Sequence, residues 1–363
     1  MKTLDKIKAA IRRKRVDALL VTQPENRRYL SGYTATDLNI AESSGVLLIP
    51  RRGTPLLFTD SRYQLQAEKE AAGFATVLLR RGLLAALPKE LGRLGIKKLA
   101  FESHYLLHGT AVKLMELGQK NGVAILPTSN IIEKLRTRKS QPEIEKIRQA
   151  VLLNESVFQE VSANLRAGKT EREVALEIEA AMMRRGAEAP AFPTIVAAGP
   201  NGAMPHAVPS ARIIKKGEPV IIDMGLKLDG YCSDMTRTVV LGKPDRQTVK
   251  IFRLVRQAQK AALKTIKAGI AAGKADRAAR EIIAGAGYGR YFGHGLGHGV
   301  GLAVHEAPSL GRARRSKLRA GMVVTVEPGI YLPGWGGVRL ENMVVVEEKG
   351  CTILNRDKTF LDL

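Results

Sequence analysis

Residues 217–241 read GEPVIIDMGLKLDGYCSDMTRTVVL, two largely apolar runs on either side of an Asp-Gly pair at 229–230. Asp-Gly between alternating apolar residues is a strong signal for a two-residue hairpin turn. With that turn, Asp223 lies opposite Thr236 in the paired strands. Side chains alternate between faces, so Asp234 projects from the same face as Asp223, as a diagonal neighbour about 7–8 Å away. The stretch therefore predicts a hairpin that presents two carboxylates on one face.

A second stretch, GMVVTVEPGIYLPGWGGVRLENMVVV at residues 321–346, weakly repeats the first. In each, a glycine is followed six residues later by a carboxylate, Asp223 or Glu327, and by another glycine two residues further on. A second carboxylate follows after a turn, Asp234 in one copy and Glu341 in the other. The helical stretches upstream, LRAGKTEREVALEI and IAAGKADRAAREII, also resemble one another. This repeat predicts an α+β domain with pseudo-twofold symmetry, whose acids can meet at the axis.

These four acids have two interpretations. They can form ordinary salt bridges, which a chain this basic supplies easily, or they can hold cations. Asp223 follows the apolar run Val-Ile-Ile, and a buried carboxylate without a cation is costly. In the second copy, alternation places Arg339 on the same face as Glu341 and gives that carboxylate a cationic neighbour. The equivalent positions of the acids in the two copies favour a cation site.

Three of the six histidines lie within residues 291–306, YFGHGLGHGVGLAVHE. Eight glycines among the seventeen residues from 285 to 301 disfavour a helix and predict loop and strand. The histidines of a flexible loop could simply face solvent. One imidazole added to four carboxylates, however, completes an oxygen-rich ligand set for a divalent metal. The other rings are then available as proton donors and acceptors around it.

The N-terminal part of the chain has a different pattern. Short apolar, β-branched segments (DALLVT, SGVLLIP, TPLLFTD, KKLAFES and VAILPTS) alternate with segments of helical spacing. This alternation predicts an α/β domain with a mixed sheet. A basic, polar stretch followed by the capping box Ser140 to Glu143 marks a boundary. We therefore expect one domain over residues 1–136 and a second over residues 137–363.

The composition, with 45% hydrophobic and 26% charged residues and no apolar run long enough for a membrane span, is typical of a globular protein. Two cysteines cannot form a disulfide framework, so we expect a cytoplasmic protein. The net charge of +23 favours polyanions in general. Basic and acidic residues are interspersed, however, without an RNA-binding motif, zinc-finger spacing or basic tail. We therefore expect no specific nucleic-acid partner, and nucleic-acid binding stays as an alternative hypothesis.

The segments HGLGHGVGLAVHE, MPHAVPS, DMG…SDMTRT, VEPGIY and GGVRLEN resemble those of the pita-bread metallopeptidases. Within that family they resemble the branch of aminopeptidase P and prolidase, the Xaa-Pro peptidases. DALLVTQPENRRYLSGYTATD and LLFTDSRYQLQA resemble the creatinase-type N-terminal domain of the same branch. The resemblance implies an α/β creatinase-type domain, a pita-bread catalytic domain, a homodimer and proline-containing peptide substrates.

The resemblance also implies roles for individual residues. Two divalent metals, manganese first with cobalt, iron or zinc as alternatives, would be bound by Asp223, Asp234, His298, Glu327 and Glu341, with Asp234 and Glu341 bridging them. Because all five positions are filled, the metal-free relative creatinase is disfavoured. Glu327 would also act as general base. Three histidines would act on the substrate: His305 would steady the tetrahedral intermediate, His206 would contact a substrate carbonyl, and His294 would line the proline pocket. Tyr331 and Arg339 would lie around the bridging carboxylates.

The resemblance leaves two activities open. Prolidases commonly carry arginine directly after the proline of the HE-x-P stretch, where it holds the terminus of a dipeptide. Here the stretch reads HEAPS, with Ser309 at that place. We therefore expect an Xaa-Pro aminopeptidase that accepts longer peptides, with Xaa-Pro dipeptidase as the alternative. A basic cluster over residues 312–319 is either a solvated loop or a source of a substitute arginine.

Overall fold

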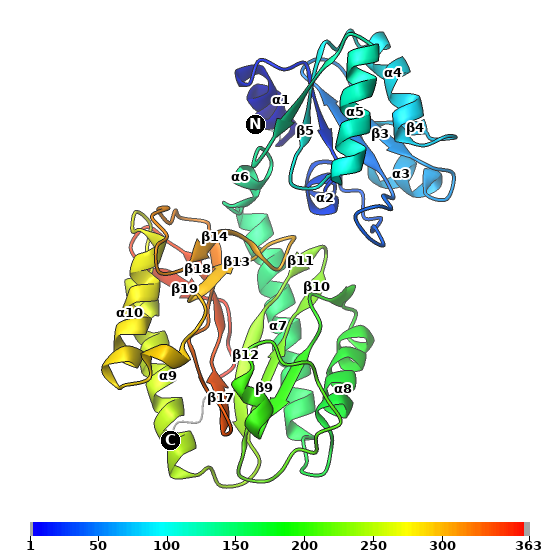
Figure 1. Ribbon diagram of the computed structural model, residues 1–363. Helices are drawn as coiled ribbons and strands as arrows, with labels where there is room; N and C mark the ends of the chain where they lie inside the picture. The colour runs from blue at the N-terminus through cyan, green and yellow to red at the C-terminus, as the bar shows by residue number, and fades with distance from the viewer. Residues whose placement is uncertain (1–2, 359–363) are drawn as a thin grey trace. The chain divides into compact units, whose positions relative to one another are not determined.

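The structure is a computed structural model that describes residues 3–358. The chain divides into two compact units, Met1–Arg136 and Thr137–Leu363 (Figure 1). Each unit is described by itself. Among the described residues, none of the helices is both long enough and apolar enough to cross a membrane.

The N-terminal unit is an α/β domain around a six-stranded mixed sheet of order β4-β3-β2-β1-β5-β6. Strand β2 runs antiparallel to both of its neighbours, and the other pairs are parallel. The strands are β1 (Ala18–Val21), β2 (Val46–Pro50), β3 (Leu56–Thr59), β4 (Ala75–Leu78), β5 (Lys98–Glu102) and β6 (Ala124–Thr128). The helices are α1 (Thr3–Arg13), α2 (Pro24–Ser31), α3 (Gln64–Glu70), α4 (Leu83–Arg93), α5 (His108–Lys120) and α6 (Glu133–Arg136). The predicted mixed sheet is confirmed.

Both faces of this sheet are covered. Alternate residues of β1 point to opposite faces, so Leu19 packs with Ile7 of α1, while Leu20 packs with Leu87 of α4. All five strands predicted from the sequence are present. The edge strand β4 was not predicted, and none of its four residues is buried.

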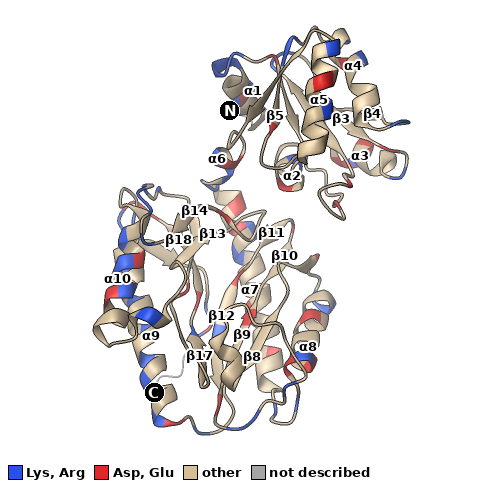
Figure 2. Ribbon diagram, in the orientation of Figure 1, with Lys and Arg blue, Asp and Glu red and all other residues tan. Residues whose placement is uncertain are grey.

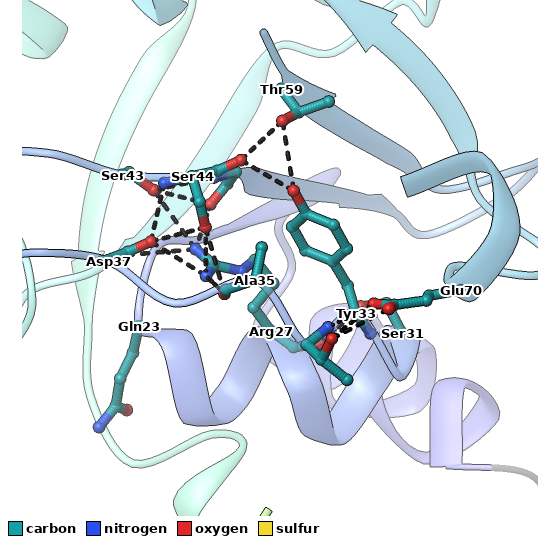
Figure 3. A network of polar contacts seen from close by, with 12 residues as sticks. Gln23, Arg27, Ser31, Tyr33, Ala35, Asp37, Ser43, Ser44, Thr59 and Glu70 are labelled. Atoms are coloured by element: carbon teal, nitrogen blue, oxygen red, sulfur yellow. Dashed lines mark hydrogen bonds and ion pairs between the residues drawn. The ribbon is translucent and has the colours of Figure 1, made fainter. Parts of the chain in front are cut away.

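A buried arginine joins α2 to the loop over residues 35–45 (Figure 3). The side chain of Arg27 is 0% exposed and lies 3.0 Å from Asp37, which is 3% exposed. Its Nη2 donates to the hydroxyl of Ser44 at 2.8 Å and to the carbonyl of Ala35 at 2.6 Å, and its Nη1 donates to the carbonyl of Gly45 at 2.6 Å. This loop is thus held by polar contacts made beneath the surface.

Replacing Asp37 by alanine is expected to destabilise the N-terminal unit by about 3–5 kcal/mol, because a buried guanidinium loses its only carboxylate contact in this network. Calorimetry should show the transition of this unit lowered by roughly 10 °C or more. Asp60→Ala is the control, since its partner Arg62 is 72% exposed, and such a surface pair contributes about 1 kcal/mol or less. Equal shifts for the two variants would contradict the prediction.

The C-terminal unit consists of two similar halves (Figure 1). Helices α7 (Gln141–Ala163) and α8 (Glu171–Arg184) pack on strands of the first half, and α9 (Arg246–Thr265) and α10 (Ala272–Gly285) pack on strands of the second. The first half contains β7 (Ala189–Pro190), β8 (Ile195–Ala198), η1 (Gly199–Ala203), β9 (Pro219–Met224), β10 (Leu226–Leu228), β11 (Tyr231–Cys232) and β12 (Met235–Val240). The second contains η2 (Gly289–Tyr291), β13 (Gly297–Gly299), β14 (Glu306–Leu310), β15 (Val323–Val326), β16 (Gly329–Leu332), β17 (Gly336–Arg339), β18 (Asn342–Val346) and β19 (Cys351–Ile353).

Local sequence signals hold in this unit. In the first hairpin Leu228 pairs with Tyr231 and Asp223 with Thr236, which confirms the predicted register. The turn residue Asp229 adopts φ 48°, a left-handed conformation that aspartate tolerates better than most residues. Both capping boxes form, at the starts of α7 and α8. The glycine-rich segment after α10 is loop with short strands, as predicted.

Candidate active site

A cavity of about 490 Å³ lies between the two halves of the C-terminal unit. Strands of both halves contribute to its wall, β9 with Asp223 in one half and β17 with Arg339 in the other. Nine of the ten residues predicted for the site line it: Asp223, Asp234, His206, His294, His298, His305, Glu327, Arg339 and Glu341. The tenth, Tyr331, lies behind this wall and is 6% exposed.

The predicted ligands form a tight cluster. One ligand atom each from Asp234, His298 and Glu341 lie within 4.8 Å of one another. His298 Nε2 lies 3.6 Å from Asp234 Oδ2 and 3.3 Å from Glu327 Oε1. The fold thus brings residues from both copies of the repeat to one point.

The electrostatics of this cluster fit a divalent metal. Burial, followed by the charges of neighbouring carboxylates, raises the pKa values of both Asp234 and Glu341 well above their usual range. Asp223 Oδ1 and Glu341 Oε1 are buried and have no hydrogen-bond partner among the described residues. Buried carboxylates that repel one another and carry unpaired oxygens are stabilised by a cation. Oxygen ligands with one imidazole suit several divalent metals.

Two threonines orient the carboxylates. Thr236 Oγ1 donates to Glu341 Oε2 at 2.7 Å and accepts from Arg339 Nε at 3.1 Å. Thr325 Oγ1 donates to Glu327 Oε1 at 3.0 Å and accepts from the backbone N–H of His298 at 3.0 Å. The sequence reasoning missed both threonines. Period-two alternation offered the signal, because each lies two residues from an acid on the same strand face.

Arg339 makes its direct ionic contact with a different acid from the one expected. Its Nη2 lies 2.6 Å from Asp223 Oδ2, and it reaches Glu341 only through the hydroxyl of Thr236. The sequence placed Arg339 beside Glu341 because the two share a strand face. Packing of β17 against β9 brings Asp223 within reach instead.

His294 belongs to a chain of hydrogen bonds behind the cavity. Its Nδ1 lies 2.7 Å from the carbonyl of Gly295, which can only accept, so Nδ1 carries a proton. In the neutral ring Nε2 then accepts from the hydroxyl of Tyr331 at 2.8 Å, and that oxygen accepts from Arg339 Nη1 at 3.0 Å. Burial lowers the pKa of His294 and raises that of Tyr331 to about 12. Tyr331 therefore contacts two site residues, and burial keeps its hydroxyl protonated.

The remaining histidines differ in their surroundings. Burial lowers the pKa of His298, but its hydrogen bond with Glu327 and the charge of that carboxylate outweigh burial, so the net shift is upward. His305 packs edge-on against His298 with ring centroids 4.3 Å apart, and burial and the charge of His298 lower its pKa. His206 is exposed at the cavity wall. The side chains facing the cluster can therefore both accept and donate protons.

Comparison with known proteins identifies the family of this chain. A model of metallopeptidase family M24 matches residues 145–348, and one of the creatinase/prolidase N-terminal domain matches residues 3–138. The chain belongs to metallopeptidase family M24.

Relatives of this M24 chain include peptidases of two specificities. It is 36% identical over 341 residues to an Xaa-Pro dipeptidase from Pyrococcus horikoshii, covering 94% of this chain and 93% of that protein. The structure of an Xaa-Pro dipeptidase from Bacillus anthracis superposes with a TM-score of 0.91 at 36% identity, over 98% and 97% of the two chains. The structure of an X-Pro aminopeptidase from Thermotoga maritima superposes with a TM-score of 0.86 at 37% identity, over 95% of this chain and 98% of that one. The creatinase-type and pita-bread architecture is thus confirmed.

The two features that the sequence offered for substrate specificity, the basic cluster and Ser309, differ in their position relative to the cavity. The basic cluster Arg312, Arg314, Arg315, Lys317 and Arg319 is exposed, as a solvated loop would be. Ser309, by contrast, lines the cavity and pairs with His298 across β13 and β14.

Proposed function

We propose that this M24 metallopeptidase is a hydrolase that cleaves the Xaa-Pro bond at the N-terminus of peptides and uses two divalent metal ions. The observation that carries the proposal is the cluster of four carboxylates and His298 at a cavity whose wall also holds His206, His294 and His305. Asp223, Asp234, His298, Glu327 and Glu341 would hold the metals, with manganese proposed first.

The bond before proline has no N–H, so an enzyme cannot orient it through that donor. Divalent metals, when bound, supply Lewis acidity and lower the pKa of water. Glu327 is placed to take the proton of the attacking water and to pass it to the departing nitrogen. Burial raises the pKa of Glu327, but the hydrogen bond and charge of His298 outweigh it, so the net shift is downward and the carboxylate stays ionised and ready to accept a proton.

The histidines on the cavity wall complete this proposal. His305, beside His298, donates a hydrogen bond to the oxyanion that develops at the scissile carbonyl. His206, from the segment after η1, contacts a substrate carbonyl. His294, fixed by Gly295 and Tyr331, borders the proline ring.

Longer peptides are proposed as the preferred substrates, which makes the enzyme an Xaa-Pro aminopeptidase. Among the described residues, Arg339 is the only arginine or lysine that lines the cavity, and its guanidinium is already bound to Asp223. Ser309 offers one neutral hydrogen bond, roughly half as strong as a charge-assisted one. A peptide amide at that place is satisfied by such a donor, whereas the carboxylate of a dipeptide is not.

Wild-type kcat/KM is expected to be higher for Xaa-Pro-Yaa than for Xaa-Pro, and Ser309→Arg to narrow or invert the ratio. The shift should be roughly tenfold or more, because a hydrogen bond to a charged group contributes about 1.5–3 kcal/mol. Steady-state kinetics on the two peptides measure it. Ser103→Arg, which adds the same charge at an exposed position of the N-terminal unit, should leave the ratio unchanged.

Xaa-Pro dipeptidase is the second candidate. Two of the three relatives described above carry that name, and Arg312 Nη2 lies 3.5 Å from the carbonyl of Phe292, two residues before the cavity-lining His294. If the wild type prefers dipeptides and Arg312→Ala or Arg314→Ala removes the preference, this candidate replaces the first.

Homodimerisation and a cytoplasmic location are parts of the same proposal, which includes no specific nucleic-acid partner. Figure 2 shows lysine and arginine spread over helices of both units, with aspartate and glutamate among them. Such a surface binds polyanions through counterion release, weakly and without sequence preference.

A further inference from the structure

Glu171, the first residue of α8, is a fully buried carboxylate that the proposed chemistry does not use. Its Oε1 accepts from the backbone N–H of Ala198 at 2.8 Å and from Asn201 Nδ2 at 3.1 Å. Its Oε2 accepts from the backbone N–H of Ser210 at 3.1 Å, from the Ser210 hydroxyl at 2.6 Å and from Asn201 Nδ2 at 3.0 Å. The side chain of Glu171 thus accepts hydrogen bonds from Ala198 and from Ser210, which are twelve residues apart in the chain.

Those donors flank a wall of the catalytic cavity. Ala198 ends β8, and Ser210 follows the five consecutive residues 205–209 that line the cavity and include His206. Glu171 therefore joins both ends of the segment to one carboxylate. We call this set of hydrogen bonds to Glu171 the clamp. The backbone adds to it, because Glu171 N–H donates to the carbonyl of Arg212 at 3.0 Å.

The middle of this segment, residues 205–209, contacts two residues of the candidate site, Arg339 and Tyr331. Arg339 Nη1 donates to the carbonyl of Pro205 at 3.2 Å, and Ala207, 5% exposed, packs in a cluster with Tyr331. The His206 side chain has no hydrogen bond to any of the described residues, so its position depends on the backbone that carries it. That backbone is held at its ends by Glu171.

The clamp needs the ionised carboxylate. A carboxylate only accepts, which matches the four donors that converge on Glu171, and the N-terminus of α8 favours its negative charge. A glutamine at this position would turn an NH₂ group toward backbone N–H donors, leaving buried donors without partners. The backbone after Ala198 or before Ser210 would then move.

We propose that Glu171 is a positioning residue, which holds His206 and its segment at the distance from the metal centre that substrate binding requires. This inference rests on the proposed function, in which His206 contacts a substrate carbonyl. Glu171 touches neither the predicted ligands nor the substrate, so its effect passes through the segment alone.

Glu171→Gln is expected to raise KM for Xaa-Pro-Yaa by about tenfold with kcat within about threefold of the wild type, since the metal centre is untouched. Glu177→Gln is the matched control, because Glu177 lies on the same helix but pairs with Lys169 at the surface, and its KM should not change. A lower unfolding midpoint with unchanged KM would mean a structural role only and would overturn the proposal.

A double-mutant cycle tests whether Glu171 acts through His206. Glu171→Gln should add nothing to the KM of His206→Ala, whereas additive effects would show that the two residues act independently and contradict the inference. If Glu171→Gln does not fold, Ser210→Ala provides a second test. It removes the bond from the Ser210 hydroxyl to Glu171, together with the bonds that this hydroxyl accepts from Asn201 Nδ2 and the Arg212 N–H, and should raise KM about two- to fivefold. An unchanged KM in Ser210→Ala would then count against the proposal.

Hydrogen exchange separates this inference from the proposed function. Residues 199–210 should exchange faster in Glu171→Gln or Ser210→Ala, while β9, β12 and β15 keep their protection. This result would support the clamp even if the wild type cleaved no Xaa-Pro peptide. Unchanged exchange over residues 199–210 would show that Glu171 does not hold the segment.

Discussion

Asp234→Ala or His298→Ala is expected to lower both metal content and peptidase activity to background, with kcat/KM reduced at least about a thousandfold. Each side chain supplies one of the three ligand atoms that lie within 4.8 Å of one another, so its loss opens a gap in the proposed ligand set. The metal contributes several kcal/mol to the reaction, and each 1.4 kcal/mol is a factor of ten in rate. Elemental analysis and hydrolysis of an Xaa-Pro-Yaa peptide measure the two quantities.

Asp229→Asn is the matched control for this experiment. Asp229 lies at the tip of the same hairpin, where its side chain is 64% exposed. Asparagine tolerates the same left-handed backbone, so the hairpin should form unchanged. The control should keep its metal and its activity. Full activity in either ligand variant would show that the metal assignment is wrong.

Glu327→Gln is expected to lower kcat by roughly 10²–10⁴-fold at saturating metal, because a positioned general base contributes about that factor. Glutamine keeps an oxygen at this place but cannot take a proton from water. Single-turnover hydrolysis with metal content measured on the same sample gives the result. Thr325→Val, which removes the hydrogen bonds of Thr325 Oγ1 with Glu327 Oε1 and with the backbone N–H of His298 but leaves the carboxylate in place, should have a much smaller effect.

The metal titration of Glu327→Gln decides between its two roles. If excess metal restores wild-type kcat, Glu327 acts only as a ligand and the general base lies elsewhere. If the metal sites fill and kcat stays low, the carboxylate is needed for proton transfer.

The sequence by itself determined those structural elements that depend only on residues close together in the chain. The Asp-Gly turn and strand alternation were enough to pair Asp223 with Thr236, since turn type sets the register of a hairpin. Capping boxes located the starts of α7 and α8 for the same reason. The repeat predicted that acids from two distant stretches would meet, because equivalent positions in similar halves face a shared axis.

Only the tertiary structure decided which side chains touch across that axis. Arg339 contacts Asp223, 116 residues away, and Thr236 bonds Glu341, 105 residues away. The buried carboxylate of Glu171 and the buried guanidinium of Arg27 gave no sign in the sequence, because such residues are ordinarily at the surface. Their contacts depend on how whole strands and loops pack together, and neither residue propensity nor periodicity contains that information.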